Sequence, residues 1–269
     1  MTSTTGKSAA SAAQNSRILE ILARIGYVVL GIVHIVIGAI AISVAQGGGG
    51  EADQGGAMQQ VASWPFGLVL LWVIGLGLFA LALWQIAEAF LVQESDTKRK
   101  WGYRVKYLGT AVAYIAIGVT ALVYAVGGSS NSDQSSETFS GQLLATPGGV
   151  FLLVLIGLIV LGVGVAFVYR GAKRKFEKHL MLPGSGTTRK GIIAFGTAGY
   201  IAKGIAVGIV GVLFVVAAVT ADPEAAGGLD AALKSLAALP FGVFILWLVG
   251  LGLVLYGVFC FARARYAKM

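Results

Sequence analysis

The sequence predicts an all-α integral membrane protein with six transmembrane helices, arranged as three parallel two-helix repeats. Three observations predict it: 57% hydrophobic against only 12% charged residues, six long apolar stretches, and a motif that occurs three times. The motif is Pro65-Phe66-Gly67 followed by Gly75-Leu76-Gly77-Leu78. It returns as Pro240-Phe241-Gly242 with Gly250-Leu251-Gly252-Leu253, and more weakly as Pro147-Gly148-Gly149 with Gly157-Leu158.

Each apolar stretch must be helical, because a lone strand leaves its backbone unpaired in lipid. A span needs about 20 apolar residues, and the predicted spans are residues 26–45, 66–87, 107–126, 148–169, 199–219 and 241–262. The Ser- and Ala-rich residues 1–16 predict a disordered tail. The three repeats then occupy residues 17–92, 93–176 and 191–269, with a basic cytoplasmic linker at 177–190.

The basic residues predict the orientation. All of the 20 Lys and Arg residues except Lys203 and Lys234 lie in the N-terminal segment, the second and fourth connections, or the C-terminus. By the positive-inside rule both termini are cytoplasmic, in a bacterial plasma membrane. This asymmetry accounts for the net charge of +8 without a nucleic-acid partner. It also predicts that the inner rim attracts anionic lipid headgroups.

Small residues recur at helical spacing on every predicted span. Those of the outgoing helices are Gly31, Gly38, Gly118, Gly204 and Gly211, and those of the returning helices are Gly75, Gly157 and Gly250. Such positions predict tight helix–helix seams. Parallel repeats favour a pseudo-threefold arrangement about the membrane normal, and a symmetric bundle without that axis stays an alternative. Tyr27, Tyr107 and Tyr200 are expected as interface anchors.

The outer connections carry short amphipathic runs at residues 58–64, 139–144 and 229–239. Each predicts a short helix on the outer surface. Each ends near a Pro that is expected to open the returning helix in its first turn. The stretches 129–136 and 184–191, rich in Ser and Gly, are expected to be flexible.

The run Glu51-Ala52-Asp53-Gln54-Gly55-Gly56-Ala57-Met58, with the Pro-Phe-Gly and Gly-Leu-Gly-Leu motifs after it, resembles the repeat of a bacterial membrane family. That family is catalogued as domain of unknown function 1206. The resemblance covers residues 24–265 and is loosest in the middle unit, where Gly148 replaces the expected aromatic residue. It implies an inner-membrane, six-helix protein, and it carries over no activity and no catalytic residues.

Two ionisable residues within the spans are candidates for a ligand or proton site. His34 lies on the seam face of the first helix, and its repeat equivalents are Tyr114 and Val207. The alternative is a neutral His that only hydrogen-bonds across the seam. Lys203 either snorkels to the inner surface, with its helix entering near Gly199, or makes a buried pair or ligand contact.

Glu88 shares its repeat position with Arg170 and Arg263. One acid and two bases at one depth predict a set of ion pairs at the inner rim, of about 0–1 kcal/mol each if exposed. A gate or binding clamp is the alternative, and Gln85, one turn inward, could line the same place.

No catalytic residues, metal ligands or cofactor are predicted. The two His, His34 and His179, lie on different elements, and no nucleophile–base pair is recognisable. Cys260 is expected as a buried thiol, with lipidation as the alternative. We therefore expect a non-enzymatic bundle that binds lipid or a partner membrane protein. A small-solute or proton-linked transporter, and an enzyme acting on lipids, are the alternatives.

Overall fold

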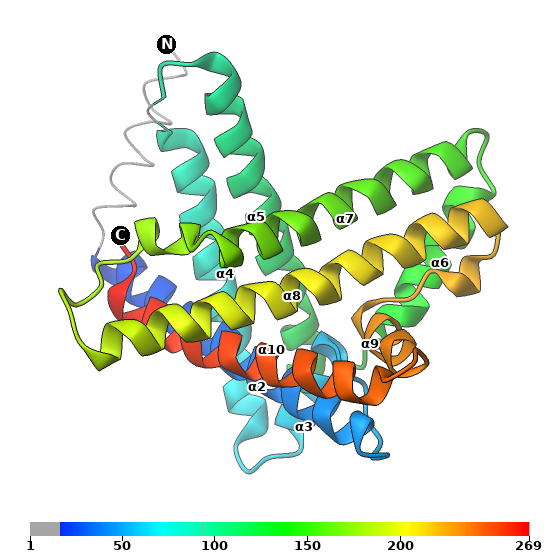
Figure 1. The fold of residues 1–269 in the computed structure, drawn as a ribbon, viewed down its shortest axis with the longest axis horizontal. Helices are drawn as coiled ribbons and strands as arrows, with labels where there is room; N and C mark the ends of the chain where they lie inside the picture. Colours follow the sequence, from blue (N-terminus) through cyan, green and yellow to red (C-terminus); the bar gives the residue numbers. More distant parts are fainter. Residues whose placement is uncertain (1–16, 93, 269) are drawn as a thin grey trace.

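The structure, a computed structural model, describes residues 17–92 and 94–268, and this part of the chain is helical, as predicted (Figure 1). Six helices are long and apolar enough to cross a membrane, which confirms the predicted fold class. The tail expected at residues 1–16 lies outside the described residues. The six helices are α2 (Arg17–Ala45), α4 (Gly67–Leu91), α5 (Thr97–Ala125), α7 (Gly149–Ala172), α8 (Thr187–Thr220) and α10 (Gly242–Tyr266).

The outgoing helices α2, α5 and α8 begin well before the predicted spans. A helix continues through polar residues while its backbone stays paired, so hydropathy marks the apolar span rather than the helix end. Asp96, for example, caps α5 by accepting a hydrogen bond of 2.9 Å from the Lys98 amide. The expectation of a flexible segment at residues 184–191 is wrong from Thr187 onward, where α8 has started.

Each unit carries a short helix between its two long ones, as expected: α3 (Gln54–Ala62), α6 (Ser132–Leu144) and α9 (Leu229–Ala237). Two of them begin earlier than the amphipathic runs because side chains cap them. Asp53 accepts from the Gly56 amide at 2.7 Å, and Asn131 accepts from the Gln134 amide at 2.9 Å. The predicted flexibility of residues 129–136 is therefore wrong over Ser132 to Ser136.

The Pro motif forms a tight turn before each returning helix and not its first turn, which corrects the expectation. The Gly67 amide donates to the Trp64 carbonyl at 2.8 Å, and the intervening Phe66 has a φ of 63°. Pro followed by a residue with positive φ is the pattern of a type II turn. Gly is required after it, because a methyl group on Gly67 would lie 2.0 Å from the Val61 carbonyl oxygen.

The predicted small residues meet in three seams, and each seam joins the returning helix of one unit to the outgoing helix of the next. A methyl group on Gly211 of α8 would lie 2.7 Å from the Gly157 carbonyl of α7. Gly75 of α4 and Gly118 of α5 face one another more loosely, with 3.4 Å between an added methyl and the opposite carbonyl. Such close backbone approach is the packing that small residues allow in membranes.

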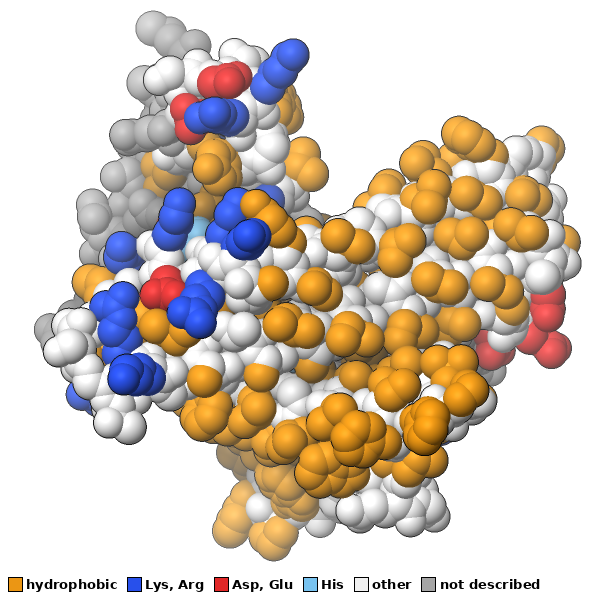
Figure 2. All heavy atoms as spheres, in the orientation of Figure 1, with side chains coloured by type: hydrophobic (Ala, Val, Ile, Leu, Met, Phe, Trp, Pro, Cys, Tyr) orange, Lys and Arg blue, Asp and Glu red, His pale blue; other side chains and the backbone are white. Residues whose placement is uncertain are grey.

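The seam between α10 and α2 brings the third unit back to the first, so the units follow one another in a cycle. Within the middle unit, however, the two long helices are apart: over the described residues, α5 and α7 make hardly any contact. Figure 2 shows an open notch there, between the arm of α4 with α5 and the arm of α7 with α8. Only 28% of the apolar window of α5 and 17% of that of α7 are buried, against 56% for α2.

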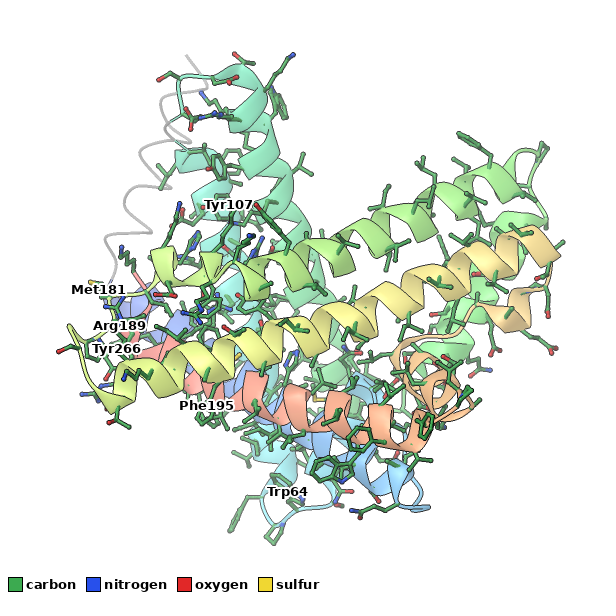
Figure 3. The ribbon with its side chains drawn as sticks, in the orientation of Figure 1. Trp64, Tyr107, Met181, Arg189, Phe195 and Tyr266 are labelled. Carbon is green, nitrogen blue, oxygen red and sulfur yellow. The ribbon has the colours of Figure 1, made fainter. Side chains whose placement is uncertain are left out.

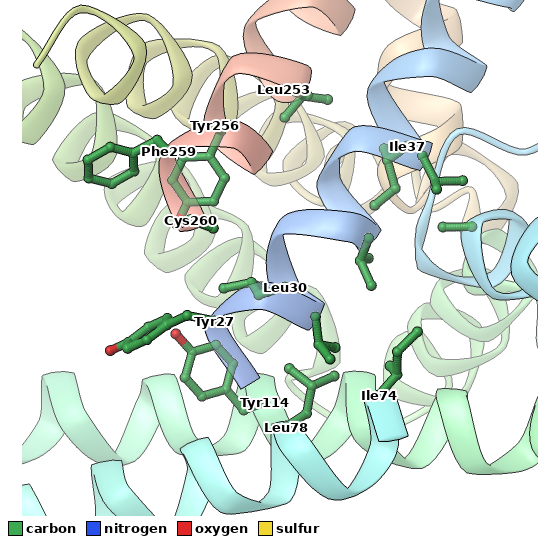
Figure 4. Close-up of a cluster of buried hydrophobic side chains, with 14 of the residues drawn as sticks. Tyr27, Leu30, Ile37, Ile74, Leu78, Tyr114, Leu253, Tyr256, Phe259 and Cys260 are labelled. Atoms are coloured by element: carbon green, nitrogen blue, oxygen red, sulfur yellow. The ribbon is translucent and has the colours of Figure 1, made fainter. Parts of the chain in front are cut away.

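Aromatic side chains fill the interior between units 1 and 3 (Figure 4). The Tyr200 ring packs edge-on against Tyr256, with centroids 5.3 Å apart, and is stacked on Phe176 at 5.4 Å. Tyr27 and Tyr200 are buried, so the expectation that they anchor at a membrane interface is wrong; Tyr107 is half-buried. Their rings bury more apolar area inside the bundle than an interface position would allow.

Candidate functional site

His34 and Lys203 lie in direct contact, from α2 and α8. The Lys203 Nζ is 3.2 Å from His34 Nε2, and His34 Nδ1 is 2.8 Å from the Leu30 carbonyl oxygen. A carbonyl only accepts, so Nδ1 carries the proton and donates it. Nε2 is then the acceptor for the ammonium. The contact joins units 1 and 3 by a charge-assisted hydrogen bond inside the bundle.

Aromatic rings surround the Lys203 ammonium. Its Nζ lies 4.6 Å from the Tyr256 ring centroid and 5.4 Å from that of Phe167. The ring of His34 is 4.8 Å from Tyr256. α8 begins at Thr187, so Lys203 lies well inside its helix. The structure thus places the ammonium among rings that attract cations.

Tyr114 of α5 is buried and lies next to Tyr27 of α2 (Figure 4). Val207, the other repeat equivalent of His34, supplies no polar group. Within the described part of the chain, the pair of His34 and Lys203 is the contact that forms among the predicted candidates. Gln85 is half-buried on α4, one turn before Glu88.

Arg263, Arg170 and Lys106 gather at the end of the bundle that carries the basic residues. The Arg263 guanidinium donates to the Tyr27 hydroxyl at 3.2 Å and lies 4.3 Å from the centre of that ring. Lys106 of α5 is within electrostatic range of Arg170, Arg263 and Glu88. The three bases and one acid come from α4, α5, α7 and α10, so this end of the cycle draws on all three units.

The segment after α7 lies beside these cations. It contains η1 (Lys175–His179) and is held to the end of α10, because the Met181 amide donates to the Tyr266 carbonyl at 2.7 Å (Figure 3). Partial loss of hydration and then the positive charges of Lys106, Arg263 and Arg170 lower the pKa of His179. His179 is therefore neutral at pH 7, which leaves the positive charge to the Lys and Arg side chains.

Sequence reasoning missed Lys106 and His179 as members of this cluster. The signal for Lys106 was available, since it precedes Tyr107, the position equivalent to Tyr27 and Tyr200. No local pattern marks His179, whose place depends on the pairing between Leu180 and Ala267.

At the opposite end, carboxylates link the three connections that hold α3, α6 and α9 in a cycle. The Ser132 hydroxyl of unit 2 donates to Asp53 of unit 1. The Gly228 amide of unit 3 donates to Asp133 of unit 2 at 2.7 Å, and the Ala52 amide of unit 1 donates to Asp230 of unit 3 at 2.8 Å. The sequence analysis did not identify these links, because hydrogen bonds between distant connections leave no local pattern.

Two of the outer acids have perturbed titration. Loss of hydration and the neighbouring carboxylates of Asp53, Asp230 and Asp133 raise the pKa of Glu51. Loss of hydration also raises the pKa of Asp133, although the amides of Gly228 and Ala231 act against it. Crowded carboxylates in partly dehydrated surroundings favour the protonated form.

Over the described residues, no group of three or more His, Cys, Asp or Glu side chains has the arrangement of a metal site. Cys260 is fully buried, beside Tyr256 and Phe259 (Figure 4). The described residues thus present a cluster of Lys and Arg at one end and a charge-assisted contact within the bundle.

Comparisons with known proteins agree with the three-unit architecture. The family described as Domain of Unknown Function (DUF1206) matches the chain three times, over residues 25–91, 105–174 and 198–267. A relative from Bacillus subtilis (strain 168), "Uncharacterized protein YxxB", is 32% identical over 252 residues, which cover 91% of this chain and 90% of the relative. No solved structure matches the chain. Each family match covers one outgoing helix, one outer connection and one returning helix.

Proposed function

The chain belongs to the family described as Domain of Unknown Function (DUF1206), and for this member we propose a non-enzymatic role in the bacterial plasma membrane. The protein binds anionic lipid through the basic end of its six-helix bundle, with both termini in the cytoplasm. The observation that carries this proposal is the separation of charge along the bundle. Lys and Arg side chains gather at one side of the molecule, and an acidic patch lies at the opposite side (Figure 2).

The separation follows from the helix ends. The basic residues lie at the starts of α2, α5 and α8 and at the ends of α7 and α10. The outer connections hold Glu51, Asp53, Asp133, Glu137, Asp222, Glu224 and Asp230. Basic residues at a cytoplasmic surface attract anionic lipids by about 1 kcal/mol each. Several of them in one rim are enough to select phosphatidylglycerol over phosphatidylcholine.

Native mass spectrometry tests lipid selection directly. The protein is purified in mild detergent and offered equal amounts of phosphatidylglycerol and phosphatidylcholine. Lipid binding predicts that phosphatidylglycerol remains bound preferentially, and that the preference decreases with salt. Equal retention of the two lipids, or recovery of the bare chain, contradicts the proposal. If a second protein co-purifies in stoichiometric amount and no lipid does, partner binding replaces lipid binding as the proposed function.

Cysteine labelling tests the orientation separately. In a Cys260→Ser background, Ser135→Cys in α6 and Lys98→Cys in α5 both place a thiol at an exposed position. A membrane-impermeant maleimide should label Ser135→Cys in intact cells and Lys98→Cys only after lysis. The reverse pattern would invert the orientation.

The contact between His34 and Lys203 supports a second candidate function, proton-linked or small-solute transport. Two ionisable side chains from different units meet inside the bundle at 3.2 Å, where such groups commonly serve transport. Flux through liposomes that contain the protein should then fall in the His34→Ala, Lys203→Ala variant. Unchanged flux removes the basis for this candidate.

A further inference from the structure

The notch lies between α5 and α7, the two helices of the middle unit, which make hardly any contact over the described residues. α2 packs against α4 and α8 packs against α10 within their units, whereas the two helices of the middle unit stay apart. Exposed apolar side chains occur along both: Leu108, Val112 and Val119 on α5, and Leu155, Ile159 and Val163 on α7. In a bilayer, hydrocarbon chains must cover such surfaces, so the notch is open to lipid.

Cations meet at the basic end of this notch. Lys106 of α5 and Arg170 of α7 are both half-buried and lie within electrostatic range of one another, although their helices do not pack. Arg263 of α10 is also in range of Lys106 and is fixed by its 3.2 Å hydrogen bond to the Tyr27 hydroxyl. Basic side chains from α5 and α7, the two walls of the notch, and from α10 of unit 3 therefore lie close together.

Among the described side chains, the charges of this cluster do not cancel. Lys106 has two further bases, Arg170 and Arg263, and one acid, Glu88, within electrostatic range. Aromatic faces hold the bases in place: Lys106 lies 4.8 Å from the Tyr107 ring and Arg170 lies 5.8 Å from the Phe167 ring. Figure 3 shows Tyr107 on α5 at this end, near α7. A held, uncompensated set of Lys and Arg suits a phosphate group, which accepts several charge-assisted hydrogen bonds.

We propose that the notch is a binding site for one anionic phospholipid, whose phosphate lies between Lys106, Arg170 and Arg263 and whose acyl chains run along α5 and α7. This site rests on the proposed function and names where the selected lipid binds. Basic pockets between transmembrane helices at the cytoplasmic side are typical headgroup sites. The notch combines open apolar walls with a cationic end. This combination favours a lipid over a free anion as the ligand, because a free anion needs no apolar wall.

The test compares two variants with equal loss of charge. Lys106→Gln/Arg170→Gln removes two cations at the notch, and Lys98→Gln/Lys173→Gln removes two exposed cations from the same end of α5 and from the end of α7. Retention of phosphatidylglycerol is titrated by native mass spectrometry for each. The site predicts about tenfold weaker binding for the first variant and less than about twofold for the second. Equal binding by both overturns it.

Two further measurements keep the test decisive. The variant Lys106→Arg/Arg170→Lys preserves both charges, so it should still bind the lipid. It tests the site even if the glutamine variant unfolds. Loss of lipid from this charge-preserving variant would overturn the site. Inorganic phosphate at millimolar concentration should not displace the lipid, and complete displacement would show a free-anion site. Wild-type protein that retains no anionic lipid would defeat the proposed function itself, whereas equal retention by wild type and both glutamine variants defeats only this site.

Discussion

Gly38 of α2 and Gly250 of α10 lie backbone against backbone. A methyl group on Gly38 would stand 2.5 Å from the Gly250 carbonyl oxygen, and one on Gly250 would stand 2.9 Å from that of Gly38. The same relation holds one seam position away, between Gly31 and Gly257. These contacts join the last helix to the first, so they turn a linear series of three units into a cycle.

Gly250→Ala should destabilise the protein by about 1–3 kcal/mol, because the added methyl group meets a backbone carbonyl that cannot rotate away. The free energy of unfolding in mixed micelles measures this. Gly162→Ala on α7 is the matched control, since a methyl group there meets nothing within 4 Å. Equal effects of the two substitutions would mean that the α2–α10 seam is not tightly packed.

Asp230→Ala should cost about 1–3 kcal/mol, because the buried Ala52 amide then loses its acceptor. Asp230→Asn keeps an acceptor oxygen and loses only the ion pair with Lys234, whose side chain is 51% exposed. That pair contributes about 0–1 kcal/mol. Thermal unfolding of both variants checks the order, and a larger cost for Asn than for Ala would exclude the hydrogen bond as the main contribution.

Glu51 should make stability fall as the pH rises above the ordinary carboxyl range of about 4. Loss of hydration and neighbouring carboxylates raise its pKa, while Lys234 acts against them. A folded state that binds the proton more tightly is stabilised at low pH and loses that advantage as the pH passes through the raised pKa. Glu51→Gln, which can still accept from Asn131, should reduce this slope in unfolding experiments. An unchanged slope contradicts the assignment.

His34 and Lys203 should be energetically coupled. In a double-mutant cycle with His34→Leu and Lys203→Met, we expect a coupling of about 1 kcal/mol, the usual size for hydrogen bonds between membrane helices. Unfolding in mixed micelles gives the four free energies. A cycle of His34→Leu with the exposed Lys173→Gln is the control and should be additive within about 0.5 kcal/mol. If the effects of His34→Leu and Lys203→Met are additive, the contact between the two side chains does not contribute to stability.

The fold was largely predictable because hydropathy, basic residues and repeated motifs are local or periodic properties of the chain. The small residues of the seams were also identified correctly, although which helices they join depends on how the units meet. The turn formed by Pro65, Phe66 and Gly67 was misassigned, since Pro fits both a first helical turn and a type II turn.

The candidate sites were less predictable, because they depend on contacts between distant units. His34 and Lys203 stood out individually as ionisable residues in apolar spans, but only the packing of α2 and α8 against the same helix, α10, brings them together. The link from Asp133 to Gly228 has no counterpart in local sequence, whereas the repeat positions of Glu88, Arg170 and Arg263 indicated part of the basic cluster around Lys106. Tyr27 and Tyr200 were placed at an interface by pattern, whereas burial between units determines their position.

Cross-linking between units 3 and 1 tests the cyclic arrangement most directly. Gln46, just after α2, and Leu239, just before α10, line one surface groove of about 500 Å³. In a Cys260→Ser background, Gln46→Cys/Leu239→Cys should form an intramolecular cross-link with a short flexible bismaleimide. The control Gln46→Cys/Thr146→Cys, whose second thiol lies in unit 2, should not. A cross-link that forms only between molecules, or equally well in the control, would contradict closure of the cycle through α2 and α10.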